Sequence, residues 1–428
     1  MRRYWKTGCI LIMIILLLTG CTAGSGNAEE TGSLTGSEST EAEQETESAL
    51  KEVYFLNSRP DLQELWTKLA DAYKKETGIT VKITAVEPQS YEAVLETAMK
   101  DENPPALFDV SSLAELEAWE KDCYDLKDTD IFEEQGTDTS RFIRRDGLVT
   151  CVGYSSGSFG LIYNKAILEE YCAREDALIF SAEEITDFSI LKAVAEDIQD
   201  KKGELGIKGA FASAGKSTSW MPGAAQFLIN FPVIYEERDK ALSQEGECLE
   251  CLGDFYELYV DNATCTPDQL TEKSAADGAV EFAFGEAAFY LGGTWMYQKL
   301  SGNVLADGDM GILPIYMGVE GEEAWGLCRG YRSYLCVNKN ASQEAIGASL
   351  EFLDWMLTDG TGKEILALED EVFNPLLEDA KLYEDKGNTA WRMMAVSSAA
   401  WLSELEDALI RYAAGEGSWA EVREAYGM

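Results

Sequence analysis

Histidine is absent from the whole 428-residue chain. The chain therefore lacks the commonest general base and the commonest metal ligand, which excludes a Ser-His-Asp or Cys-His catalytic site built from its own residues. Basic residues are also scarce, with 35 Lys and Arg against 77 Asp and Glu, for a net charge of −42. A protein with so large a negative charge repels the phosphate backbones of nucleic acids. We therefore expect no nucleic-acid partner. We expect no cofactor and no metal.

Long apolar runs are also missing, apart from a short one near the N-terminus. Arg2, Arg3 and Lys6 precede an apolar run over residues 10–18, which is too short to cross a bilayer. This anatomy predicts a signal peptide over residues 1–20. The run ends in Leu-Thr-Gly-Cys21, which resembles the bacterial lipobox, and that resemblance implies lipidation of Cys21. The alternative is an ordinary signal peptide that happens to contain a cysteine.

Residues 21–50 contain little that could form a core. They are rich in Glu, Ser and Thr, and Leu34 and Leu50 are their only large apolar side chains. Such a segment cannot bury enough surface to offset the entropy of ordering it, so we expect a disordered acidic tether. The N-terminus thus predicts a lipid-anchored protein on the extracellular face of a bacterial cell membrane.

Ten cysteines occur, and Cys248 and Cys251 form a C-x-x-C pair. This spacing suits a redox pair or half of a zinc site. However, the chain has no second C-x-x-C and no histidine to complete a metal site, and the pair lies in a helical pattern over residues 248–260. We therefore favour buried free thiols, although one or more disulfides stay open.

From residue 51 onward, strand and helix patterns alternate. Asp61 can cap the first helix and Gly78 ends it, and the predicted elements are strands at 53–56, 79–85 and 107–110 and helices at 62–73 and 91–100. This is a βαβαβ unit, which implies a parallel sheet flanked by helices. Ligands of such sheets bind beyond the carboxyl ends of the strands, so residues 57–59 and 109–112 form a candidate site.

The remaining chain continues the α/β pattern. A strand-rich stretch at 149–163 is interrupted by Ser-Ser-Gly-Ser at 155–158, and a helix at 276–284 leads into a strand at 287–291. Further helices are predicted at 187–200, 220–230, 247–260, 342–359 and 397–414. No internal repeat and no second linker of low complexity occur, so two lobes should be joined by several chain crossings.

Several segments of residues 51–428 resemble the extracellular solute-binding proteins of ABC importers, in their carbohydrate-binding branch. These are Leu-Ile-Tyr-Asn-Lys at 161–165, Phe-Ala-Phe-Gly-Glu-Ala-Ala-Phe at 282–289 followed by Gly292, Gly293 and Trp295, Gly-Ile-Leu-Pro at 311–314, and residues 334–342. Their order and spacing carry the resemblance over most of the chain.

The resemblance implies a type II periplasmic-binding-protein fold, in which two α/β lobes surround a central cleft and close on a ligand. We expect lobe 1 to contain residues 51–157 and 313–372, and lobe 2 to contain residues 158–312 and 373–428. The implied function is a monomeric, non-enzymatic protein that delivers a sugar or oligosaccharide to the permease subunits of an ABC transporter.

The resemblance also implies ligand-binding residues, with Trp295 stacking on a sugar ring. The others are Asn57, Arg59, Asp109, Tyr154, Ser155, Trp220, Arg329, Tyr331 and Trp401. A sugar offers hydroxyls and apolar C–H faces, which planar polar groups and aromatic rings recognise. Each residue also has a plainer interpretation. Asp109 could cap a helix, Arg59 could form a surface ion pair, and the others could be packing residues.

Three other functions stay open. The ligand could be a peptide, an amino acid or a polyamine. The same fold could serve a sensor or an adhesin, because fold alone does not define function. A lipid-anchored glycosidase would need a pair of carboxylates, and no motif locates such a pair.

Overall fold

The computed structural model describes residues 52–427 except 112, 136–140, 213–237, 303, 307, 319–320, 325, 369–373, 384–388 and 393–398. The predicted signal peptide, the tether, Cys21, Trp220 and the helix at 220–230 therefore lie outside the described residues. Among the residues that are described, no helix combines the length and the apolar character needed to cross a membrane.

Ten strands in the described ranges form one hydrogen-bonded sheet with the order β2-β1-β3-β9-β5-β7-β6, while β10 pairs with β9, and β4 and β8 pair with β5. The strands are β1 (Glu52–Asn57), β2 (Thr80–Ala85), β3 (Leu107–Val110), β4 (Phe142–Arg145), β5 (Leu148–Asn164), β6 (Gly209–Phe211), β7 (Ala287–Gly293), β8 (Met310–Leu313), β9 (Cys328–Val337) and β10 (Thr389–Arg392).

Helices connect these strands, which gives the mixed α/β fold that the alternating pattern predicted. They are α1 (Gln63–Thr77), α2 (Pro88–Ala98), α3 (Leu113–Trp119), α4 (Asp130–Gln135), α5 (Lys165–Cys172), α6 (Phe188–Asp200), α8 (Arg238–Asp261), α9 (Ala275–Ala283), α10 (Tyr297–Leu300), α11 (Gln343–Thr358), α12 (Gly360–Ala367), α13 (Pro375–Lys381), α14 (Ala399–Ala413) and α15 (Trp419–Tyr426).

The predicted βαβαβ unit is confirmed, because β1 pairs in parallel with both β2 and β3. Gly78 ends α1 in the left-handed conformation, with φ of 79°, which glycine adopts without steric cost. The prediction that Asp61 caps this helix is wrong. A short 3-10 turn, Pro60–Leu62, precedes α1, and the Asp61 carboxylate instead accepts hydrogen bonds from the Arg59 guanidinium.

Side chains of β1, β3 and β9 alternate between two apolar cores, one on each face of the sheet. Phe55 and Leu335 pack with α1 and α11 on one face, whereas Leu56 and Tyr334 pack with α2 on the other. This alternation follows from the two-residue period of a strand. A third core lies around β7, β8 and the second half of β5, together with α5, α6, α9 and α14.

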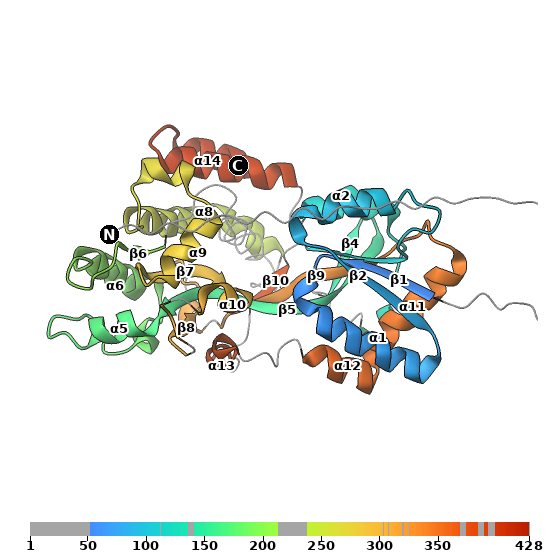
Figure 1. Cartoon of the computed structure of the whole chain (residues 1–428). Helices are drawn as coiled ribbons and strands as arrows, with labels where there is room; N and C mark the ends of the chain where they lie inside the picture. The colour runs from blue at the N-terminus through green and yellow to red at the C-terminus, as the bar shows by residue number, and fades with distance from the viewer. Residues whose placement is uncertain are drawn as a thin grey trace, which may run out of the picture. The chain divides into compact units, whose positions relative to one another are not determined.

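Two long antiparallel strands, β5 and β9, run between these cores, as Figure 1 shows. On β5, Val152 belongs to one core and Phe159 to another, and the pairing of the two strands extends from Val152 to Phe159. The predicted interruption at 155–158 is therefore wrong. The segment stays extended because β9 supplies backbone partners throughout, although the register shifts around Ser155.

The expected lobe boundary at residue 313 falls within a segment that packs with the core around β7. Leu313, Ile315, Tyr316, Met317 and Leu327 all belong to the core around β7. The physical reason is that β8 pairs with residues Leu161–Asn164 of β5, which keeps the following chain on that side. The chain returns to the first cores later, along β9.

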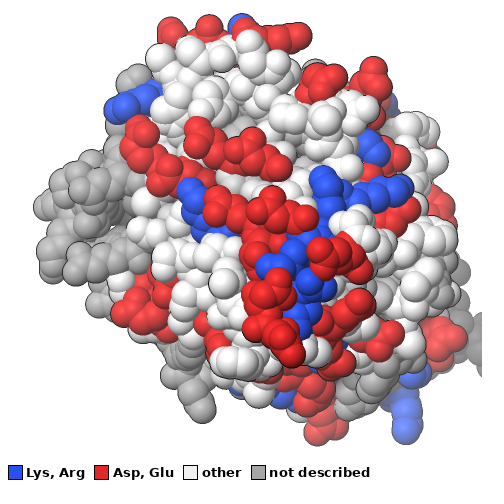
Figure 2. Space-filling view, turned by 90° about the vertical axis from the view of Figure 1, so that its left-hand side faces the viewer, with Lys and Arg blue, Asp and Glu red and all other residues white. Residues whose placement is uncertain are grey.

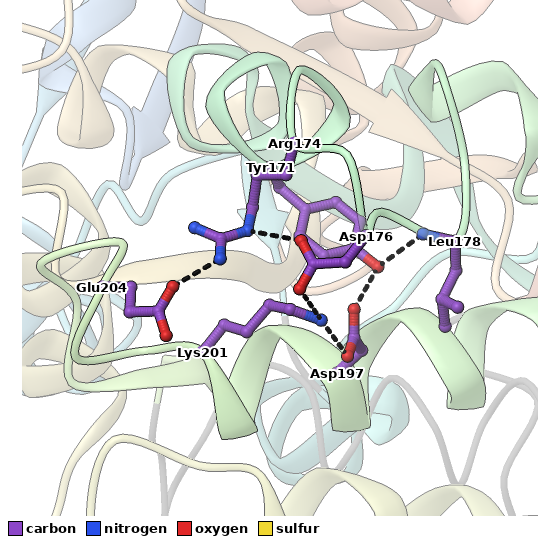
Figure 3. Close-up of polar contacts among 7 residues, drawn as sticks. All are labelled: Tyr171, Arg174, Asp176, Leu178, Asp197, Lys201 and Glu204. Atoms are coloured by element: carbon purple, nitrogen blue, oxygen red, sulfur yellow. Dashed lines mark hydrogen bonds and ion pairs between the residues drawn. The ribbon is translucent and has the colours of Figure 1, made fainter.

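A polar network joins α5 to α6 (Figure 3). The buried Tyr171 hydroxyl donates to Asp197 over 2.7 Å and accepts from the backbone N–H of Leu178 over 3.1 Å. Lys201 pairs with Asp197 and with Asp176, and Arg174 pairs with Asp176. Figure 2, viewed from the side on which α5 and α6 lie in Figure 1, shows basic and acidic side chains interleaved across this face.

The described cysteines are free thiols. They are Cys123, Cys151, Cys172, Cys251, Cys265, Cys328 and Cys336, and four of them are buried. Cys248 and Cys251 both lie on α8, as the helical pattern predicted, and the side chain of Cys248 is outside the described part of the chain. Within the described residues, no group of acidic or cysteine side chains could hold a metal ion.

Candidate functional site

A cleft of about 500 Å³ opens where the ends of several strands meet. Its walls come from segments that are far apart in the sequence. They are Ser58–Leu62 after β1, Glu87–Gln89 after β2, Ser156 on β5, Thr294, Trp295, and Tyr297–Lys299 after β7, Arg332 on β9, and Asn374 and Leu377 at α13.

The cleft lies where parallel α/β sheets are expected to bind ligands. One wall follows the carboxyl ends of β1 and β2, which are neighbouring parallel strands. The other wall follows the carboxyl end of β7, which belongs to the other core. Because each wall is attached to a different core, a molecule in the cleft would contact both.

Ser58 forms the polar floor next to β1 and is held from behind by Asp109. The Asp109 carboxylate accepts the Ser58 backbone N–H and the Ser58 Oγ–H, each over 2.9 Å. Burial raises the pKa of Asp109 to about 6. The hydrogen bonds from Tyr91 and Ser58 favour the charged form and offset part of this rise. Asp109 itself does not line the cleft, so its role is to position Ser58.

Arg59 lines the cleft with its guanidinium fixed by Asp61. Its Nε and Nη2 donate to the Asp61 carboxylate over 2.9 and 2.7 Å. Burial by itself would raise the pKa of Asp61. The hydrogen bond and positive charge of Arg59, together with the charge of Arg332, have the larger effect, so the pKa of Asp61 is lowered. The buried Asn57 accepts the Arg59 backbone N–H over 3.0 Å and so shapes the turn.

Trp295 projects into the cleft from a short turn after β7, with part of its indole exposed. The ring stacks on Phe159, with centroids 6.3 Å apart, and the Arg332 guanidinium lies 5.8 Å from the ring centroid. Gly157 and Gly293 provide the backbone on which the indole rests, since a Cβ at Gly293 would lie 2.2 Å from the ring. The two glycines therefore set where the indole sits.

Three predicted residues on β5 and β9 lie next to residues that line the cleft. On β5, Tyr154 and Ser155 are buried, while the following Ser156 reaches the cleft. On β9, Tyr331 covers Gly153 on one side of the sheet, and the adjacent Arg332 lines the cleft. Successive side chains of a strand point to opposite faces, so neighbouring residues of one strand reach different sides of the sheet.

Two further predicted residues, Arg329 and Trp401, are not among the described residues that line the cleft. Arg329 is exposed on β9. Trp401 on α14 packs its indole against Tyr426 and donates from Nε1 to the Tyr426 carbonyl oxygen over 3.3 Å. Trp220 is outside the described residues. Of the predicted ligand-binding residues, the structure brings Arg59 and Trp295 together in the cleft, with Asp109, Asn57 and Tyr154 directly behind.

Sequence reasoning missed part of the second wall. Gln298 and Lys299 follow Trp295 on α10, and Asn374 donates from Nδ2 to the carbonyl oxygen of Thr294 over 3.0 Å. The motif around Trp295 could have indicated Gln298 and Lys299, because a helix that follows the end of a strand lies at the same edge of the sheet. No local pattern marks Asn374.

The cleft offers hydrogen-bonding side chains, cations and an aromatic face, which together suit binding of a polar solute. Among the described residues, its carboxylates are Asp61, which is neutralised by Arg59, and Glu87 at the start of α2. A glycosidase needs two carboxylates placed on either side of one bond, with one of them kept protonated. The pKa of Asp61 is lowered, which favours its charged form, so Asp61 does not meet the requirement for a protonated carboxylate.

Comparison with known proteins identifies the fold. A secreted solute-binding lipoprotein from Streptomyces coelicolor, described as probable, superposes with a TM-score of 0.65 and 16% identity, covering 88% of this chain and 98% of that one. A family 1 extracellular solute-binding protein from Bifidobacterium longum subsp. infantis gives a TM-score of 0.60 and 16% identity, over 87% and 97%.

RafE from Streptococcus pneumoniae, solved in complex with raffinose, gives a TM-score of 0.60 and 14% identity over 87% and 97% of the two chains. These likenesses confirm the expected binding-protein fold. A comparison with curated protein sequences finds no significant match. A model of the bacterial extracellular solute-binding protein family matches residues 68–381, so the chain belongs to this non-catalytic family.

Proposed function

We propose that this protein captures a sugar in the cleft beside Trp295 and delivers it to an ABC importer, while a lipid on Cys21 anchors it outside the cell. The proposal rests chiefly on the 500 Å³ cleft, whose two walls belong to different cores and combine an indole face with hydroxyl, amide and guanidinium groups. RafE, a structural neighbour, was solved with raffinose, which supports the assignment of a sugar.

The side chains of the cleft complement the two kinds of surface that a sugar presents. Trp295, Tyr297 and Leu377 offer apolar area to C–H faces. Hydroxyls can pair with the neutral polar side chains of the described lining, which include Ser58, Gln89, Ser156, Thr294, Gln298 and Asn374. These hydrogen bonds gain strength when water is excluded, so closing the cleft on the ligand increases affinity.

Closure requires the two walls to move as separate bodies. We propose two lobes, residues 51–157 with 328–372 and residues 158–327 with 373–428, joined by β5 and β9. The crossing strands change register between Gly153 and Ser156, which interrupts the regular ladder where bending is needed. A ligand that contacts both walls favours the closed state by the difference in its affinity for the two states.

The charges of the cleft argue against a polyamine, one of the alternative ligands. Among the described lining residues, Arg59, Lys299 and Arg332 are basic and Asp61 and Glu87 are acidic, and Arg59 pairs with Asp61, so this part of the lining lacks the acidic excess that a polycation would require. A peptide ligand and a sensor role are alternative outcomes of the experiments below.

The decisive experiment is calorimetric titration of the purified full-length protein with mono- and oligosaccharides, peptides and polyamines. We expect a sugar to bind, and Trp295→Ala to weaken that binding at least about tenfold through the loss of stacking area. Trp119→Ala, at another half-buried tryptophan outside the cleft lining, should leave affinity unchanged. Binding of a peptide and of no sugar would overturn the proposal.

Transport itself is tested in cells. Deleting the gene should abolish uptake of the radiolabelled sugar identified by calorimetry, and restoring the intact gene should recover it. Normal uptake together with loss of a transcriptional response to that sugar would favour a sensor instead.

A further inference from the structure

Ser58, which lines the cleft, is tied to Asp109 through both of its hydrogen-bond donors. Its backbone N–H donates to Oδ1 of the Asp109 carboxylate and its Oγ–H donates to Oδ2, each over 2.9 Å. A charged carboxylate can only accept hydrogen bonds, so the direction of both bonds is fixed. The Ser58 hydroxyl oxygen keeps its lone pairs, so Ser58 can only accept a hydrogen bond from a ligand while Asp109 is charged.

The surroundings of Asp109 hold this arrangement in place. Asp109 is fully buried on β3, where the Tyr91 hydroxyl of α2 donates to its backbone carbonyl oxygen over 2.8 Å. The Tyr154 hydroxyl of β5 donates to Oδ2 over 3.4 Å, which is longer than the bond from Ser58. Turning the Ser58 hydroxyl toward the cleft would break a hydrogen bond to a buried charge, which costs more than a bond between neutral groups.

A neutral side chain at position 109 would reverse the polarity of Ser58. Oδ1 accepts a hydrogen bond from a backbone N–H, which can only donate. A proton on the carboxyl group, or the amide Nδ2 of an asparagine, therefore belongs at the position of Oδ2. From there it donates to Ser58 Oγ, the nearer of the two hydroxyls at Oδ2. The hydrogen of the Ser58 hydroxyl is then released for a ligand.

We propose that Asp109 is a positioning residue that sets the hydrogen-bonding polarity of Ser58. With Asp109 charged, the bound sugar must place a hydroxyl hydrogen against Ser58, and with residue 109 neutral the preference turns toward a ligand acceptor. This inference rests on the proposed function and deepens it, because it names the character that the sugar needs at this wall. Asp109 acts through Ser58, since it does not itself line the cleft.

The same polarity should respond to pH in the unaltered protein. The groups around Asp109 are Ser58, Tyr91 of α2, Tyr154 of β5 and Glu115 of α3. Burial raises the pKa of Asp109 to about 6, and the negative charge of Glu115 adds to the rise. The carboxyl group is therefore mostly charged at about pH 7.5 and mostly protonated at about pH 5.

The test maps each hydroxyl of a bound sugar. The probe is the sugar that binds the purified full-length protein most tightly in the calorimetric panel, with its monodeoxy and monodeoxyfluoro derivatives. Fluorine accepts a hydrogen bond weakly and cannot donate one. At about pH 7.5 we expect one position at which both derivatives bind about tenfold more weakly than the parent sugar. Ser58→Ala should remove this penalty at that position alone, which identifies the hydroxyl that meets Ser58.

Asp109→Asn then tests the polarity. At the position assigned to Ser58, the fluoro derivative should bind Asp109→Asn within about threefold of the parent sugar, while the deoxy derivative stays weak. Asp101→Asn, at an exposed aspartate outside the described lining, should keep the tenfold penalty. A merely structural role for Asp109 would weaken the parent and its derivatives alike and leave their ratio unchanged.

The pH comparison needs no substitution, so it decides the matter even if Asp109→Asn does not fold. The wild type at about pH 5 should show the ratio expected of Asp109→Asn, and the ratio in Asp109→Asn should not change with pH.

The outcomes separate this inference from the function on which it rests. A ratio that changes neither in Asp109→Asn nor between the two pH values overturns the inference and leaves sugar capture intact. The same holds if Ser58→Ala changes the penalty at no position. Binding of no sugar at all overturns both.

Discussion

The Ser58 hydroxyl donates a hydrogen bond to the buried Asp109 carboxylate over 2.9 Å, and the Ser58 backbone N–H donates a second hydrogen bond to the same carboxylate. Ser58 comes from the loop after β1 and Asp109 from β3, so the bond fixes the cleft floor to the neighbouring strand. Asp109, which does not line the cleft, thereby positions Ser58, which does.

Asp109 predicts a specific pH dependence of stability. Its folded pKa of about 6 is above the ordinary value of 3.8, because burial disfavours the charge. The native state therefore holds the proton more tightly, so this group stabilises the fold at low pH and loses that contribution as pH rises through about 6.

Asp109→Asn removes this titration. Between pH 4 and pH 7, the free energy of unfolding of the wild type should fall by about 2 kcal/mol relative to Asp109→Asn. Urea denaturation of both proteins at several pH values measures the difference. Parallel stability curves across this range would contradict the assignment of the raised pKa to Asp109.

Gly157→Ala should disturb the site through Trp295. A Cβ at position 157 would lie 2.7 Å from Cε3 of the indole, so the ring must move. We expect sugar affinity to fall about tenfold and the free energy of unfolding to fall by about 1–3 kcal/mol, as in other overpacked sites. Calorimetry and urea denaturation measure the two effects.

The matched control is Gly347→Ala on α11, where a Cβ would meet no atom within 4 Å. Because alanine is the better helix former, this variant should gain about 0.5–1 kcal/mol of stability and keep its affinity. If Gly157→Ala also kept full affinity, the glycine would not be needed to position Trp295.

Tyr171→Phe tests the network between α5 and α6. It removes the donor to Asp197 and leaves the Leu178 N–H without its acceptor, which should cost about 1–3 kcal/mol of stability. Sugar affinity should not change, since neither helix lines the cleft. Thermal and urea denaturation are the measurements.

Tyr54→Phe serves as the comparison for Tyr171→Phe. The Tyr54 hydroxyl makes no hydrogen bond to any described residue, so its removal should change stability by less than about 0.5 kcal/mol. Equal effects of the two substitutions would show that the network adds nothing.

Cys21→Ser tests the predicted lipid anchor. A chain that has lost its signal peptide and carries no acyl chains on residue 21 lacks the predicted anchor, so it should move from the membrane fraction to the medium. Immunoblots of the two fractions measure this, with Cys172→Ser as the control. Full membrane retention of Cys21→Ser would rule out the lipobox interpretation.

The sequence by itself determined the elements whose signals are local. Apolar periodicity predicted β1, α1, β2, α2 and β3, and Gly78 marked the end of α1 because its backbone needs a positive φ. Strand and helix alternation then led to a parallel arrangement with a site at the strand ends. The strand ends placed Arg59 in the candidate site, whereas Trp295 was implied by the resemblance to solute-binding proteins.

Only the tertiary structure decided which neighbouring residue reaches the cleft. Ser156 rather than Ser155, and Arg332 rather than Tyr331, line it because the side chains of a strand alternate and the register between β5 and β9 shifts. The Ser-Ser-Gly-Ser segment remains a strand because β9 supplies its hydrogen bonds. Ser58 and Asp109 are 51 residues apart, and a contact over that separation is set by sheet order, which no local pattern encodes.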